Sequence, residues 1–152
     1  MYRIIPIDKQ VASQIRETLR DNYGHKLKEA VLSHRALCRY CLADGDLRET
    51  QILFSYSPFY ENKTPYAEVG PVFIHAECKQ YDSRNGFPQD LKTRNYLTVR
   101  GYSNDQLLIS GEMCKGEGIE ATIERMFQQS RVDYIHINDA RSGCFFMKLL
   151  KT

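Results

Sequence analysis

The apolar positions near the N-terminus predict one strand followed by two helices. Residues 2–7 are rich in isoleucine, which favours the strand. A helical spacing of apolar residues begins after Asp8, a suitable N-cap, and ends at Gly24, which can adopt the left-handed conformation that closes a helix. The apolar face of this helix is formed by Val11, Ile15 and Leu19. The same spacing over residues 27–34 predicts a second, shorter helix.

Strand patterns dominate the rest of the chain. Short apolar runs bounded by turn residues predict strands at residues 51–57, 72–75, 96–102, 106–111, 134–138 and 144–150. Proline and glycine in the segments between them predict loops at residues 58–71 and 81–92. Residues 119–127 return to helical spacing, with glutamates near the start and arginines near the end, and predict a third helix.

The order of these elements defines the expected fold class. One strand, two helices, several strands, one helix and two strands lack the regular alternation of a doubly wound parallel sheet. We therefore predict an α+β fold in a single globular domain over residues 1–152. Its sheet is expected to be mixed or mostly antiparallel, with about six strands and about three helices packed on one face.

Composition narrows the choice of partner. The 152 residues include 42% hydrophobic and 26% charged side chains, which are ordinary values for a globular chain. The 21 basic and 19 acidic residues give a formal net charge of only +2, and the two signs are well mixed along the sequence. Without a basic stripe we expect no nucleic-acid partner, so a small molecule or another protein is expected instead.

The five cysteines have to be interpreted together with the expected compartment. The apolar run at the N-terminus is ended by Asp8 and Lys9 and is too short for a secretory signal, and no stretch has the length of a transmembrane helix. We therefore expect a cytoplasmic protein that does not enter the membrane. In that reducing compartment, cysteines serve as thiols or metal ligands rather than as disulfides.

Four segments of the chain are similar to one bacterial family. Residues 38–42, 55–59, 65–78 and 134–145 resemble the family called domain of unknown function 1203. The most specific part is the pattern Tyr-x-Glu-x-Gly-Pro-x-Phe-x-His at residues 66–75. The resemblance spans most of the chain and implies an intact domain. It carries no established activity, substrate or cofactor.

Two short motifs together suggest a metal site. Cys38 and Cys41 have Cys-x-x-Cys spacing, and His75 and Cys78 have His-x-x-Cys spacing. Zinc prefers four sulfur and nitrogen ligands in a tetrahedron, so the two pairs would form a Cys₃His site if the fold brings them together. The alternative is that these cysteines are small buried apolar residues without a ligand. Redox chemistry is disfavoured, because the Cys-x-x-Cys motif follows a predicted helix instead of opening one.

A second set of residues suggests catalysis on a small molecule. His136 and Cys144 flank a loop and would form a base and a nucleophile if they face each other across a hairpin. Glu68 and His75 would supply acid–base groups beside an aromatic-lined pocket. The aromatic residues of this region are Phe54, Tyr56, Phe59, Tyr60 and Tyr66. The alternative is that His136, Cys144 and these rings only pack a sheet.

Three functional hypotheses remain open from the sequence. The first is a small binding or accessory protein whose Cys/His cluster holds a structural zinc ion. The second is a small-molecule enzyme that uses Glu68, His75, His136 and Cys144. The third is a protein-interaction module that uses the aromatic loop without a metal. The sequence lacks the glycine-rich nucleotide motifs, the His-Glu-x-x-His element and the Gly-x-Ser-x-Gly element, which removes the commonest nucleotide-binding, zinc-protease and hydrolase classes.

Overall fold

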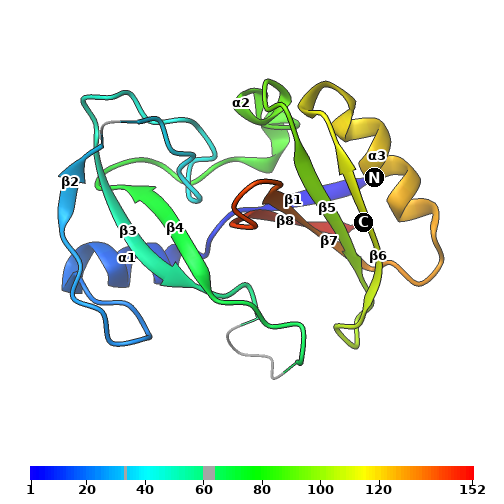
Figure 1. Ribbon diagram of the computed structural model, residues 1–152, viewed down its shortest axis with the longest axis horizontal. Helices are drawn as coiled ribbons and strands as arrows, with labels where there is room; N and C mark the ends of the chain where they lie inside the picture. The colour runs from blue at the N-terminus through cyan, green and yellow to red at the C-terminus, as the bar shows by residue number, and fades with distance from the viewer. Residues whose placement is uncertain (33, 60–63) are drawn as a thin grey trace.

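Two antiparallel sheets and their covering helices make up the fold (Figure 1). The computed structural model describes residues 1–32, 34–59 and 64–152. In chain order the elements are β1 (Tyr2–Ile5), α1 (Lys9–Thr18), β2 (Glu29–Val31), β3 (Thr50–Tyr56), β4 (Gly70–His75), η1 (Ser83–Asn85), α2 (Gln89–Lys92), β5 (Leu97–Tyr102), β6 (Leu108–Cys114), η2 (Gly116–Gly118), α3 (Ile119–Gln128), β7 (Tyr134–Asp139) and β8 (Phe145–Lys151). The η elements are short 3₁₀ helices.

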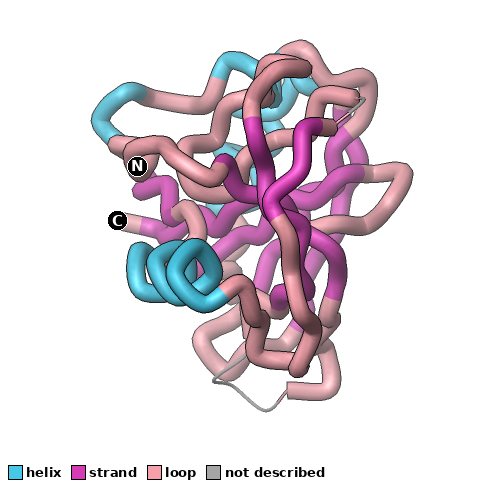
Figure 2. The backbone as a smooth tube through the Cα atoms, turned by 90° about the vertical axis from the view of Figure 1, so that its left-hand side faces the viewer, coloured by secondary structure: helices cyan, strands magenta, loops and turns pink. Residues whose placement is uncertain are grey.

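The larger sheet has five strands in the order β1-β8-β7-β5-β6, and each neighbouring pair is antiparallel. The first and last strands pair with each other, so the two termini lie side by side (Figures 1 and 2). Helix α3 covers this sheet with a fully buried apolar face. Its residues Ile119, Ile123 and Met126 pack in one cluster with apolar residues of β5, β7 and β8.

The smaller sheet has three antiparallel strands in the order β2-β3-β4. Helix α1 packs on it, because Ala12 and Ile15 belong to the same buried cluster as Ile52 and Ile74. The Asp8 carboxylate accepts a hydrogen bond from the backbone N–H of Gln10 and caps the start of α1, as the sequence predicts.

A short segment before β3 contacts both sheets. Cys38 forms a parallel bridge with Phe73 of β4. The neighbouring Arg39 side chain is 4% exposed, and its Nε donates a 2.7 Å hydrogen bond to the carbonyl oxygen of Phe145 in β8. Burial lowers the pKa of Arg39 to about 10. The segment that carries the first cysteine pair is thus held by both sheets.

The α+β class and most of the predicted strands are confirmed, and the predicted loop at 81–92 contains the short elements η1 and α2. The helix predicted at residues 27–34 is wrong, because residues 29–31 pair with β3 as an edge strand. Helix α1 ends at Thr18, earlier than predicted, because Leu19 takes the left-handed conformation with φ 47°. Gly24 is left-handed too, but it lies in the turn that follows.

The arrangement of the strands differs from the expected single sheet. Eight strands form two sheets within the described residues, and the two longer helices pack on different sheets. Periodicity marks a strand but does not say which strand it pairs with, so the division into two sheets could not be deduced from it. Among the helices of the described residues, none is both long and apolar enough to cross a membrane.

Candidate metal centre and inter-sheet cavity

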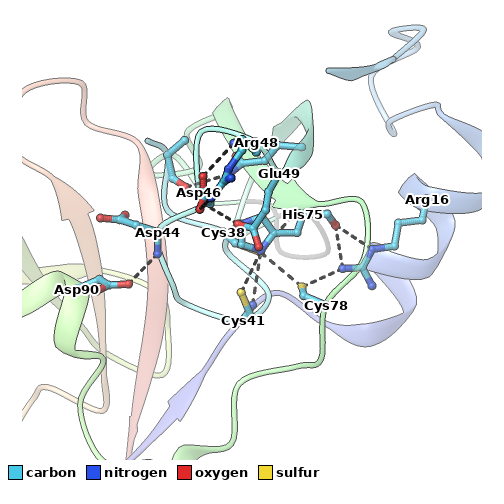
Figure 3. A network of polar contacts seen from close by, with 12 residues as sticks. Arg16, Cys38, Cys41, Asp44, Asp46, Arg48, Glu49, His75, Cys78 and Asp90 are labelled. Atoms are coloured by element: carbon cyan, nitrogen blue, oxygen red, sulfur yellow. Dashed lines mark hydrogen bonds and ion pairs between the residues drawn. The ribbon is translucent and has the colours of Figure 1, made fainter. Parts of the chain in front are cut away.

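The two predicted ligand pairs meet at the end of β4 (Figure 3). Cys38 and Cys41 lie in a turn in which the N–H of Leu42 donates to the carbonyl oxygen of Cys38 at 2.8 Å. Leu42 closes that turn with a left-handed φ of 56°. His75 is the last residue of β4, and Cys78 follows after a bend at Ala76 and Glu77. The bridge between Cys38 and Phe73 brings the two ligand pairs together.

The four side chains converge on one point. Their ligand atoms all lie within 4.8 Å of one another. The Sγ atoms of Cys38 and Cys78 are 3.8 Å apart, and Cys41 Sγ lies 3.3 Å from His75 Nδ1. Zinc–sulfur bonds of about 2.3 Å and zinc–nitrogen bonds of about 2.0 Å in a tetrahedron give edges of about 3.8 Å and about 3.5 Å. The cluster therefore has the ligand set and dimensions to hold a metal ion.

Hydrogen-bond donors surround the sulfur atoms. The backbone N–H groups of His75 and Cys41 point at Cys38 Sγ, at 3.3 Å and 3.5 Å. The guanidinium of Arg16 reaches from α1, where its Nη2 donates to Cys78 Sγ at 3.1 Å and to the carbonyl oxygen of His75 at 3.0 Å. Such donors stabilise thiolates, which is the form that binds a metal.

A carboxylate lies behind His75. The Nε2 atom of His75 is buried and has no hydrogen-bond partner in the described part of the chain. It lies 3.4 Å from Glu49 Oε2, with which it forms an ion pair when the ring is protonated. If Nδ1 binds a metal, Nε2 carries the proton and faces this carboxylate. A carboxylate behind a ligating histidine is a common way to fix the ring and its tautomer.

The protonation of the cluster prepares it for a cation. Hydrogen bonds from the Cys41 and Cys78 side chains lower the pKa of Cys38, and the interaction with Cys38 raises the pKa of Cys41. Hydrogen bonding to the Cys38 and Cys78 side chains raises the pKa of His75 to about 10. The Cys38 sulfur thus becomes negatively charged, while Cys41 and His75 keep their protons. A metal ion that binds there must displace those protons.

The second predicted set of residues is divided by the structure. Glu68, His136 and Cys144 line one cavity of about 300 Å³, whereas His75 belongs to the group of four candidate metal ligands. The cavity takes its walls from both sheets, with Tyr56 of β3 on one side and β5 and β7 on the other. Three of the four residues proposed for catalysis therefore line the same cavity.

His136 lies in an aromatic cage. The side chain is 2% exposed, and the rings of Phe59, Tyr102, Tyr134 and Phe145 have centroids 4.8 to 5.2 Å from its own. Burial, helped by the charges of Lys148 and Arg100, lowers the pKa of His136 to about 3. Within the described residues no hydrogen bond joins His136 to Cys144, the base and nucleophile expected from the sequence.

Two polar residues of the cavity were not selected as site residues from the sequence. Arg100 donates from Nη1 to Glu68 Oε2 at 2.7 Å. Asn138 donates from Nδ2 to the carbonyl oxygen of Gly143 at 2.9 Å, while its buried Oδ1 has no partner among the described residues. The signal that could have found them is the strand alternation, which places residues 98, 100 and 102, and likewise 136 and 138, on one face.

The aromatic loop is mostly buried. Phe54 and Phe59 are 3% and 4% exposed, and Tyr56 and Phe59 line the cavity. Tyr66 is 41% exposed, and Tyr60 lies outside the described residues. These rings therefore shape an interior wall more than an outer surface.

Comparison with known proteins agrees with the resemblance seen in the sequence. The sequence profile of the family described as "Protein of unknown function (DUF1203)" matches residues 36–150, so the chain belongs to this family. The matched region contains the four cluster residues and every residue that lines the cavity. No curated protein and no solved structure matches the chain.

Proposed function

We propose that the protein is a small binding or accessory protein whose fold is held by one structural zinc ion. Cys38, Cys41, His75 and Cys78 supply the ligands. The observation that carries the proposal is the convergence of their four ligand atoms within 4.8 Å. Three thiolates and one imidazole in a tetrahedron suit zinc better than magnesium or calcium, which prefer oxygen ligands.

A structural role follows from the number of protein ligands. A catalytic zinc ion keeps one position for water or substrate, whereas four protein side chains close the coordination sphere. The ion would join the turn at Cys38 to the end of β4, and Arg16 would link both to α1. These segments are distant in sequence, so the ion stabilises tertiary structure.

Metal analysis of the purified, tag-free protein tests this proposal. We expect about one zinc ion per chain, and a strong chelator should remove the ion and lower the melting temperature together. Added zinc should restore the original melting temperature. A folded protein that contains no metal and ignores the chelator would show that the cysteines are plain core residues. Iron or another metal in place of zinc would contradict the assignment of the ion.

The environment of such a site is reducing. We place the protein in the cytoplasm, because three thiolate ligands survive best where thiols stay reduced. The net charge of +2 with mixed signs supports a small-molecule or protein partner over nucleic acid. Fluorescence anisotropy with labelled DNA and RNA would test this, since binding at physiological salt would contradict it.

The second candidate function is a small-molecule enzyme. It is favoured by the meeting of Glu68, His136 and Cys144 at one cavity. Against it, a histidine with a pKa of about 3 is a weak base at neutral pH, and it makes no hydrogen bond to Cys144 among the described residues. A cavity that binds without reacting agrees better with these properties.

A further inference from the structure

We propose that the cavity between the two sheets binds a small aromatic carboxylate that also carries a hydrogen-bond donor. Arg100 would bind the carboxylate and Asn138 would accept the hydrogen bond. None of the four cluster residues lines this cavity, so the inference does not depend on the metal ion.

The walls of the cavity favour an aromatic ring. The space of about 300 Å³ lies at the lower end of the usual range for small-ligand sites. Aromatic side chains contribute much of the lining, namely Tyr56, Phe59, Tyr102 and Phe145. Stacked and edge-on contacts with such rings stabilise a planar apolar ligand beyond the area that it buries.

Two basic side chains flank His136 on the sheet, and one of them, Arg100, lines the cavity. Arg100 of β5 lies directly opposite His136 of β7, which in turn lies opposite Lys148 of β8. Directly opposite residues share one face of a sheet, so the side chains of Arg100 and Lys148 flank the neutral imidazole. Burial is the main cause of the lowered pKa of His136, and both charges add to it. Because the guanidinium of Arg100 lines the cavity, an anionic group is favoured beside it.

The existing partner of Arg100 leaves room for a ligand. Glu68 binds Nη1 of Arg100, but its side chain is 64% exposed and the pair is open to solvent. Such exposed ion pairs are weak, because water and salt screen them. A guanidinium has five N–H donors and binds a carboxylate through two parallel hydrogen bonds. A ligand carboxylate can thus bind beside Glu68 or replace it.

The position of Asn138 suggests the donor. Its Nδ2 is held by the carbonyl oxygen of Gly143, so the orientation of the amide is fixed, and its buried Oδ1 has no donor among the described residues. Supplying that donor relieves a buried acceptor. Asn138 is the diagonal neighbour of Arg100 across the β5–β7 pair, a separation of about 7–8 Å. One benzene ring with a substituent at each end has a comparable length.

The test is a titration of the purified full-length protein with 4-hydroxybenzoate, followed by backbone amide NMR. Benzoate is the matched ligand without the donor, and 4-hydroxybenzamide is the matched ligand without the charge. We expect saturable shifts at Arg100, His136 and Asn138 with 4-hydroxybenzoate. Both matched ligands should bind about tenfold more weakly.

Substitutions test whether Arg100 and Asn138 contribute to that binding. Arg100→Gln and Asn138→Leu should each weaken 4-hydroxybenzoate about tenfold. Arg141→Gln is the control, because Arg141 lies in the loop beside the cavity, does not line it and is 87% exposed. It should change the affinity less than about twofold. The ligand comparison on the unmodified chain stands even if a variant fails to fold.

Several results would overturn the proposal. One is the absence of saturable shifts at cavity residues with millimolar 4-hydroxybenzoate. Another is equal binding of 4-hydroxybenzamide, which would remove the role of the charge. A third is unchanged affinity of a folded Arg100→Gln protein. Tighter binding of inorganic phosphate than of the aromatic carboxylate would also contradict it, because a phosphate site needs no aromatic wall.

Discussion

Cys38 and Cys78 lie 40 residues apart in the sequence, and their Sγ atoms lie 3.8 Å apart in the fold. This is the separation of about 3.8 Å expected for two thiolates on one tetrahedral zinc ion. It arises because the strand-like bridge from Cys38 to Phe73 sets the first cysteine pair beside the end of β4. The cluster therefore depends on tertiary structure, and its loss should destabilise the whole fold.

Replacing one ligand should separate a metal site from a group of core cysteines. We expect Cys38→Ser to lose zinc and to lower the free energy of unfolding by about 3 kcal/mol or more. Metal content and urea denaturation measure the two effects. Cys144→Ser is the matched control, because Cys144 is a free cysteine outside the cluster and should leave the zinc content unchanged. A stable Cys38→Ser protein that still contains about one zinc ion per chain would contradict the assignment of Cys38 as a zinc ligand.

Arg16 should tune the metal site without binding the metal. Its guanidinium donates one hydrogen bond to Cys78 Sγ and two to the carbonyl oxygen of His75, so Arg16→Gln removes the contacts to both ligand residues. Loss of such outer contacts typically costs about 10- to 100-fold in metal affinity. We expect a zinc affinity lower by about tenfold or more, measured by competition with a chromogenic chelator.

The control for Arg16 is another arginine with no contact to a ligand. Arg48 has a side chain that is 90% exposed and pairs with Asp46, so Arg48→Gln should leave the zinc affinity unchanged. Both variants should keep the circular dichroism spectrum of the unmodified protein. Equal zinc affinity in the two variants would mean that the Arg16 contacts do not stabilise the bound state.

The sequence predicted the four candidate metal ligands but not the reason that they meet. Cys-x-x-Cys and His-x-x-Cys spacings are local, and a two-residue gap lets both members of a pair turn toward one point. Their convergence depends on the parallel bridge to Phe73, a long-range contact that no local pattern encodes. The outer contacts from Arg16 and Glu49 depend on packing in the same way.

Strands with strong β-branched or aromatic patterns were predicted well, whereas weak amphipathic patterns were not. Residues 134–138 form part of β7, the central strand of the larger sheet, and all five of them are buried. The helical spacing at residues 27–34 failed, because Ala30 pairs with Gln51 at the edge of the small sheet and Val31 is exposed. A short segment gains more from a neighbouring strand than from its own helical propensity.

Gly45 gives a steric test of the metal site. A Cβ atom at this position would clash with Gln51 Nε2 and would lie 2.9 Å from His75 Nε2. Gly45→Ala should therefore displace both side chains and lower the free energy of unfolding by about 1–3 kcal/mol. It should also weaken zinc binding, because His75 must move. Urea denaturation and chelator competition give the two measurements.

Gly111 offers the matched control for Gly45. A Cβ atom there would meet no heavy atom within 4 Å. Gly111→Ala should leave the stability unchanged or raise it slightly, because alanine loses less backbone entropy than glycine in a strand. If Gly45→Ala and Gly111→Ala have the same stability and zinc affinity, the close approach of Gly45 to His75 is of no consequence.

His136 should make the stability depend on pH. Its folded-state pKa of about 3 lies below the ordinary histidine value of 6.5. Above about pH 6.5 both states are neutral at this residue, and below it the unfolded chain binds a proton that the folded chain does not. The free energy of unfolding therefore falls as the pH falls from about 6.5 towards about 3, with a slope of up to about 1.4 kcal/mol per pH unit.

Replacing His136 with phenylalanine should remove this pH dependence. The ring already lies among Phe59, Tyr102 and Phe145, so a phenyl group suits the site. Urea denaturation of both proteins between about pH 7.5 and about pH 5 gives the difference in unfolding free energy. Protonation of the candidate metal ligands affects both proteins equally, so it cancels in this difference. We expect the His136→Phe protein to gain stability relative to the unmodified chain as the pH falls. Parallel pH profiles would mean that His136 accepts its proton equally well in the folded state, and the aromatic cage would then not exclude the charged ring.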